Sequence, residues 1–177
     1  MVVAAAGSKR MTGRSRTVKA AVGLCVDRVD FEGQAAMQLD ALVDRRALDE
    51  ARASEPYPIA VPKLARSDLH YFEPLGMWRA ILGDLFEKTR PALVAARFHL
   101  AVAEAVRRLV SHAARRAGRS LPVTLTGGVF QNRVLSEATI ELLERDGMEV
   151  WTHASVPAND GGISLGQAAV AAARAMM

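Results

Sequence analysis

The chain has little of what stabilises disulfide-rich, metal-binding or membrane proteins. It carries one cysteine, Cys25, among 177 residues, which excludes an internal disulfide and any cysteine-rich zinc or iron–sulfur site. It has no uncharged apolar run of about 18 residues that would span a membrane. Its first residues also lack the order of a signal peptide, in which charge comes first and an apolar run follows. We therefore expect a cytoplasmic protein with no membrane partner.

Aromatic residues are scarce, and most of the chain carries no net positive charge. Aromatics make up 5%, and the first 20 residues hold five bases and no acid. The remaining residues carry 18 bases and 19 acids, so the formal net charge of +4 comes from that first segment. No nucleic-acid-binding module follows it. We expect residues 1–13 to be a basic, disordered leader and predict no specific nucleic-acid partner.

The chain as a whole has the composition of one globular domain. Half of the residues are hydrophobic and 24% are charged, at a length that suits a single domain. Helical spacing of apolar residues begins at Arg14 and is interrupted near Phe31. The next segments predict a helix over 33–51, a short proline-bracketed edge strand over 57–61 that pairs with 68–72, and a helix over 74–86.

The second half predicts an α/β unit. Its apolar spacing favours a long helix that starts at Pro91 and stops at Ala117-Gly118. Four further elements follow in the order strand, helix, strand, helix, over 121–126, 132–146, 148–152 and 163–176. Two strands joined by a crossover helix must run parallel. The fold class is therefore α/β, rich in helix.

Two glycine-bearing loops follow the predicted strands. One is Thr126-Gly127-Gly128-Val129-Phe130-Gln131-Asn132, and the other is Pro157-Ala158-Asn159-Asp160-Gly161-Gly162-Ile163. Loops at the carboxyl ends of parallel strands open on one sheet edge, where ligands bind. Glycines there let backbone N–H groups and a helix dipole meet an anion, so the pair is predicted to hold a nucleotide, with the Asp160 carboxylate available to a metal or a ribose hydroxyl.

A purely structural alternative stays open for these loops. Glycine pairs after strands often serve only as turns, and Asn132 or Asp160 would then simply cap a helix. Neither loop has the Lys-Ser/Thr of a phosphate-binding P-loop or the G-x-G-x-x-G spacing. The four histidines have no metal-binding spacing: His99 is expected to be packed on the long helix, and His153 lies nearest the loops.

Three segments resemble one protein family. The stretch TLTGGVFQNRVLSEATIELLERDGMEVWTHASVPANDGGISLGQAAVA resembles the C-terminal end of HypF, the carbamoyltransferase family that matures [NiFe]-hydrogenases. FEGQAAMQLDAL at 31–42 is similar to that family's glutamate-bearing EGQAAM segment. RPALVAARFHLAVAEAV at 90–106 is similar to its next long helix. The resemblance runs in order from about residue 28 to the end.

The resemblance implies a fold and an activity. The fold would be the C-terminal lobe of an actin-, Hsp70- and sugar-kinase-like (ribonuclease H-like) architecture, here a partial Kae-like lobe over 14–177. The family transfers a carbamoyl group from carbamoyl-adenylate, made with ATP, to the C-terminal cysteine of a HypE partner. By this resemblance the nucleotide would contact Gly127, Gly128, Gly161 and Asn132, and its ribose would approach Glu32. Asp160 would bind a divalent metal, zinc or iron, if another lobe supplies the remaining ligands.

The sequence departs from the family in ways that bear on activity. The segment 11–26 matches the family poorly, with Thr17 where the family has an aspartate. The family's other domains and the histidine-bearing first lobe are not in this sequence, so we expect the isolated chain to be inactive unless another chain supplies them. The alternatives are a catalytically dead nucleotide-binding lobe and a lobe that only binds a HypE-like partner. A lone lobe would also expose apolar surface, which favours self-association.

Overall fold

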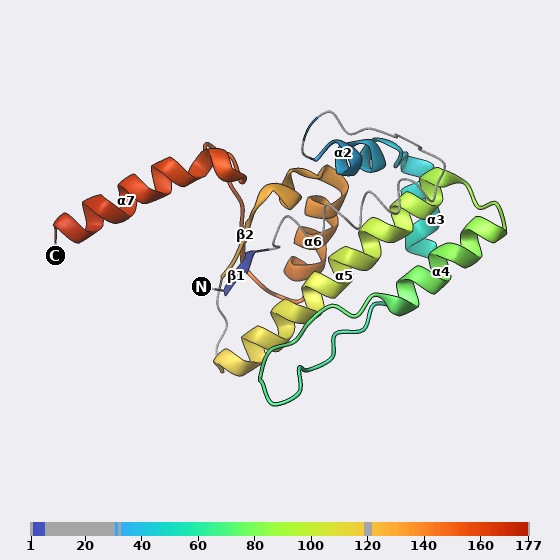
Figure 1. Cartoon of the computed structure of the whole chain (residues 1–177), viewed down its shortest axis with the longest axis horizontal. Helices are drawn as coiled ribbons and strands as arrows, with labels where there is room; N and C mark the ends of the chain where they lie inside the picture. Colours follow the sequence, from blue (N-terminus) through green and yellow to red (C-terminus); the bar gives the residue numbers. More distant parts are fainter. Residues whose placement is uncertain (1, 6–30, 32, 119–121, 177) are drawn as a thin grey trace.

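The computed structural model describes residues 2–5, 31, 33–118 and 122–176. Figure 1 shows a helical body with a small sheet at one side and a last helix that extends away from it. The helix expected between Arg14 and Phe31, with Cys25, lies outside the described residues, and so does Glu32.

The sheet has three parallel strands in the order β1-β2-β3. They are β1 (Val2–Ala5), β2 (Val123–Thr126) and β3 (Val150–Trp151), with Val123 paired to Val2 on one side and to Val150 on the other. Parallel pairing of β2 and β3 confirms the predicted crossover unit. Residues 2–5 were expected to belong to a disordered leader, but the apolar segment VVAA forms an edge strand that pairs with β2. The basic residues of the leader come only after this strand.

Two helices pack on the sheet and on each other. Helix α5 (Pro91–Ala117) has proline in its first turn and ends at Gly118, whose φ of 65° suits a glycine cap, as the sequence predicts. Helix α6 (Arg133–Arg145) is the crossover between β2 and β3. Side chains of both helices close over β2 in one buried cluster of Val106, Val110, Val123, Leu125 and Leu143. This cluster fixes the ends of β2 and α6 relative to α5.

The predicted helix over 33–51 is two helices. They are α2 (Gln34–Ala41) and α3 (Arg45–Ala53), and the prediction of one continuous helix was wrong. The break has a physical cause in Asp44, whose backbone is extended and whose carboxylate accepts a hydrogen bond from the Ala47 N–H at 2.6 Å. An aspartate in this geometry caps a new helix. Buried Leu39 and Ala47 nevertheless join the same core, so the apolar spacing survives the break.

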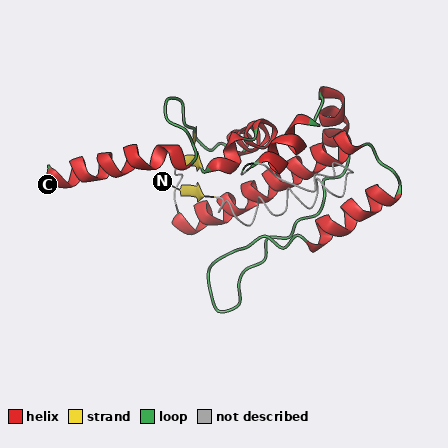
Figure 2. Ribbon diagram, turned by 45° about the horizontal axis from the view of Figure 1, so that its top comes forward, coloured by secondary structure: helices red, strands yellow, loops and turns green. Residues whose placement is uncertain are grey.

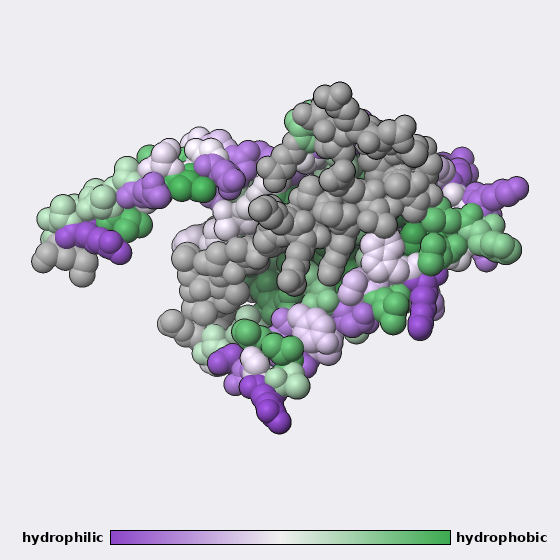
Figure 3. All heavy atoms as spheres, viewed as in Figure 1, coloured by the Kyte–Doolittle hydropathy of each residue, from purple (hydrophilic) through white to green (hydrophobic). Residues whose placement is uncertain are grey.

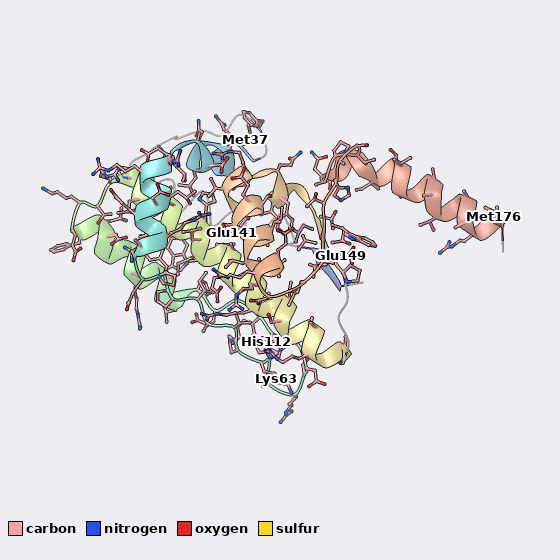
Figure 4. The ribbon with its side chains drawn as sticks, turned by 180° about the vertical axis from the view of Figure 1, so that it is seen from behind. Met37, Lys63, His112, Glu141, Glu149 and Met176 are labelled. Carbon is pink, nitrogen blue, oxygen red and sulfur yellow. The ribbon has the colours of Figure 1, made fainter. Side chains whose placement is uncertain are left out.

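The proline-bracketed segment forms a loose hairpin before helix α4 (Leu75–Phe86). Its arms meet at two antiparallel bridges, Ala60 with Glu73 and Lys63 with His70, and they do not form the expected continuous strands. The prolines in this arm lack the N–H donors that a ladder requires. The hairpin lies against the end of α5, where the His70 ring stacks on His112 with 3.9 Å between ring centres (Figure 4).

A buried polar cluster joins the hairpin arm to α4 and α5. The Arg97 guanidinium pairs with the Asp84 carboxylate at 2.6 Å and lies over the ring of Tyr57, 4.3 Å from its centre. The Tyr57 hydroxyl donates a hydrogen bond to the same carboxylate. Burial and this hydrogen bond raise the pKa of Tyr57, so the hydroxyl keeps its proton. One carboxylate thus binds two neighbours inside the core.

Helix α7 (Ile163–Ala175) matches the predicted last helix and projects from the body, as Figures 1 and 2 show. Its side chains are exposed along the whole length, including the apolar residues Ile163, Leu165 and Val170. Apolar and polar side chains alternate on its visible surface in Figure 3. Among the described residues, each helix is too short or too polar to span a lipid bilayer.

Candidate functional site

The two predicted glycine loops lie side by side at the carboxyl ends of β2 and β3. The Gly127 N–H donates a hydrogen bond of 2.7 Å to the Ala158 carbonyl, which joins one loop directly to the other. A Cβ atom at Gly128 would lie 3.6 Å from the Cβ of Asn159, an ordinary van der Waals contact. The His153 ring, which follows β3, meets the Thr126 hydroxyl at the end of β2, 3.0 Å away. The expectation that both loops open on one sheet edge is confirmed.

Each loop forms a short 3-10 turn between its strand and its helix. The first turn, η1 (Gly128–Gln131), follows Gly127, whose φ of 104° and ψ of 151° belong to a region that only glycine enters freely. The second turn, η2 (Asp160–Gly162), starts after Asn159 and leads directly into α7. We call residues 127–131, which include η1, the first glycine turn. We call residues 157–162, which include η2, the second glycine turn.

The second glycine turn is tightly folded. The Asn159 side chain accepts a hydrogen bond from the Gly161 N–H at 3.0 Å, and so Asn159, not Asp160, caps the turn. A Cβ atom at Gly162 would lie 2.7 Å from the carbonyl oxygen of Pro157, closer than van der Waals contact allows. Glycine at this position therefore has a steric reason in addition to any ligand. Asp160 itself is exposed.

Asn132 caps α6, which confirms the alternative prediction that this residue serves as a helix cap. Its side-chain oxygen accepts a hydrogen bond from the Leu135 N–H at 2.8 Å. Its side-chain nitrogen lies 2.9 Å from Nε2 of His99 on α5. The predicted contact of Asn132 with a nucleotide stays a prediction, and its side-chain amide would make such a contact through its remaining N–H or through the second lone pair of its oxygen.

The sequence interpretation missed Asp40 of α2. Its carboxylate accepts a hydrogen bond from the Val134 N–H at 3.1 Å and so places a negative group at the start of α6. The N–H groups of Val134 and Leu135 are thereby occupied by the protein itself. The prediction that an anion meets backbone N–H groups and the helix dipole at this loop stays a prediction, and an anion there would have to use N–H groups other than these two. Asp40 lies in the segment FEGQAAMQLDAL, and the apolar spacing of this segment does not reveal the contact with α6.

The described residues do not form a metal site by themselves. Nowhere in the ranges 2–5, 33–118 and 122–176 do three His, Cys, Asp or Glu side chains gather in a way that would hold a metal ion. Asp160 offers one carboxylate, whereas divalent metals in proteins take several ligands. A metal at Asp160 would therefore need ligands from outside the described residues.

Comparisons with known proteins agree with this architecture. The family model described as "Carbamoyltransferase, Kae1-like Domain, second subdomain" matches residues 12–167. Carbamoyltransferase HypF of Rhodobacter capsulatus is 35% identical over 161 residues, which make up 89% of this chain and 18% of the relative. HypF of Rhizobium leguminosarum bv. viciae is 33% identical over 146 residues, or 80% of this chain and 17% of the relative.

Solved structures show the same relationship. A crystal structure of full-length HypF in a phosphate- and nucleotide-bound form superposes with a TM-score of 0.76 at 36% identity, over 90% of this chain and 20% of that one. HypF of T. kodakarensis gives a TM-score of 0.63 at 25% identity, over 87% of this chain and 19% of that one. This chain spans about a fifth of the length of these relatives. It belongs to the carbamoyltransferase HypF family, as the second subdomain of its Kae1-like domain.

Proposed function

We propose that this chain is the nucleotide-binding lobe of a HypF-like carbamoyltransferase. The lobe would hold carbamoyl-adenylate, made from ATP, against its two glycine turns while the carbamoyl group passes to the C-terminal cysteine of a HypE-like partner. The observation that carries the proposal is the hydrogen bond between the Gly127 N–H and the Ala158 carbonyl, because it makes one site out of two loops. The nucleotide-bound state of the solved full-length HypF supports the choice of ligand.

The residues divide this work by their chemistry. Gly127 and Gly128 lack side chains that would block a phosphate from the first turn, where the phosphate would meet amides other than those of Gly127 and Phe130, which are bonded within the protein. Gly161 likewise adds no side chain to the second turn, although its own N–H already donates to the Asn159 side chain. Asn132 borders the site at the start of α6. These groups would orient the nucleotide and stabilise negative charge on its phosphate as the carbamoyl group leaves.

Two further proposed roles belong to Glu32, which lies outside the described residues, and to Asp160. Glu32 would approach the ribose, and Asp160 would supply one ligand to zinc or iron once other ligands complete the site. We propose that a first Kae1-like subdomain supplies them, and that this lobe alone does not turn over. The assay is carbamoyl-phosphate-dependent exchange of pyrophosphate into ATP. Exchange by the isolated chain at the rate of a complete HypF would contradict the proposed inactivity.

A second candidate function is a lobe that binds a nucleotide or a HypE-like protein without chemistry. The exposed apolar side chains Ile163, Leu165 and Val170 of α7 favour it, because such residues usually pack against another polypeptide. The same surface supports self-association. Light scattering across a concentration series distinguishes a monomer from an associating chain, and a pull-down with a HypE-like protein tests the partner.

The central test is ATP binding measured by isothermal titration calorimetry. The Gly127→Ala variant forces a side chain into backbone that only glycine enters freely, and we expect about tenfold weaker binding, since such strain costs about 1–3 kcal/mol. Gly147→Ala is a matched control, because Gly147 also has a positive φ, 77°, but follows the far end of α6. Equal weakening in both variants, or none in Gly127→Ala, would overturn the proposed site.

A further inference from the structure

His99 is a buried polar side chain in the middle of the long helix. Only 3% of its surface is exposed, and its Nδ1 lies 2.7 Å from the Ala95 carbonyl oxygen one turn earlier. A carbonyl oxygen only accepts hydrogen bonds, so the Nδ1 atom must carry the ring proton. In the neutral ring Nε2 is then a bare acceptor. The helix itself thus determines which nitrogen of His99 accepts a hydrogen bond.

That acceptor faces the site. Nε2 of His99 lies 2.9 Å from the side-chain nitrogen of Asn132, which donates to it. The opposite end of the same amide accepts from the Leu135 N–H. Both ends of the Asn132 amide are therefore fixed, one by α5 and one by α6. Asn132 directly follows the first glycine turn, and its own N–H donates to the Val129 carbonyl at 3.2 Å.

We propose that His99 is a positioning residue of the nucleotide site: through Nε2 it orients the Asn132 amide and so holds the first glycine turn in its binding conformation. The inference rests on the proposed function and deepens it. His99 does not touch the ligand in this scheme.

The surroundings of His99 favour the neutral ring that this role requires. Burial lowers the pKa of His99, and the hydrogen bond to Ala95 and the nearby Asp40 carboxylate oppose this only in part. A charged ring would carry a proton on Nε2 and could no longer accept from Asn132. An apolar side chain would fill the same space without a polar group to satisfy, so packing alone gives no reason for histidine here.

Two matched variants separate positioning from packing. In His99→Gln the side-chain amide oxygen can take the place of Nε2 and accept from Asn132. In His99→Asn the shorter amide can still donate to Ala95 but cannot reach Asn132. Both are neutral, polar and similar in size. We expect His99→Gln to keep the ATP dissociation constant of the wild-type chain within about threefold and His99→Asn to weaken it about tenfold, as loss of a buried hydrogen bond implies.

Nitrogen-15 NMR gives a readout that does not need ATP. We expect the wild-type His99 ring in the Nδ1–H form, and backbone amide signals of the first glycine turn that shift in His99→Asn and stay close to wild type in His99→Gln. A ring protonated on Nε2, or equal shifts in the two variants, would overturn the inference. If the wild-type chain fails to bind ATP, the proposed function fails, whereas these NMR results still decide the role of His99.

Discussion

Substituting Gly162 by alanine should disturb the nucleotide site without adding charge or polarity. The backbone at Gly162 is ordinary, with a φ of −86°, so the effect is steric. The new Cβ would lie 2.7 Å from the Pro157 carbonyl oxygen and 3.0 Å from a methyl group of Val156. Relief requires the loop backbone to move by roughly half an ångström, at a cost of about 1–3 kcal/mol, as for other overpacked sites.

The displacement reaches the junction of the two turns. Pro157 immediately precedes Ala158, whose carbonyl accepts the hydrogen bond from the Gly127 N–H. We expect the ATP dissociation constant of Gly162→Ala, measured by calorimetry, to rise about tenfold, which is the effect of about 1.4 kcal/mol. Gly166→Ala is the control, because a Cβ there meets nothing within 4 Å. It should leave ATP binding unchanged and stabilise α7 by up to about 1 kcal/mol. The same affinity in both variants would refute the role of the second glycine turn.

Two further predictions concern stability. Asp84→Ala leaves the Tyr57 hydroxyl and the Arg97 guanidinium without their shared partner, and should lower the free energy of unfolding in urea by about 3–5 kcal/mol, whereas Arg46→Ala breaks only an exposed pair and should cost less than about 0.5 kcal/mol. Comparable losses in the two variants would contradict the account of the buried cluster. The free energy of unfolding should also fall as the pH drops below about 6.5, because burial lowers the pKa of His99 in the folded state and the unfolded chain takes up the proton first. The loss continues until the pH passes the folded-state pKa and should be smaller in His99→Gln; identical pH profiles would show that His99 does not contribute.

The elements that the sequence predicted well are those with local signals. Pro91 and Gly118 mark the ends of α5, and the glycines at 127–128 and 147 separate β2, α6 and β3. The break between α2 and α3 was missed because apolar spacing continues through it, although Asp44 carries the signal of a cap. Strand β1 was missed because its partner β2 lies more than a hundred residues away, and four apolar residues before a basic segment do not reveal such pairing.

The sequence predicts the local features of the candidate site but not its long-range contacts. The glycines and their positions after two strands are local features, and topology alone brings the two loops together. The contacts of His99 and Asp40 with the start of α6 join residues 33 and 94 positions apart, and no spacing rule reports such contacts. The role of Asn132 as a cap was foreseen as an alternative, but its second bond to His99 was not.

The most direct measurement of the central claim is an NMR titration of the wild-type chain with ATP. If the two turns form one nucleotide site, the amide signals of Gly127, Gly128, Gly161 and Gly162 should shift together, with one dissociation constant, while that of Gly147 at the far end of α6 stays in place. Shifts confined to one turn, or spread over residues remote from both, would contradict a shared site.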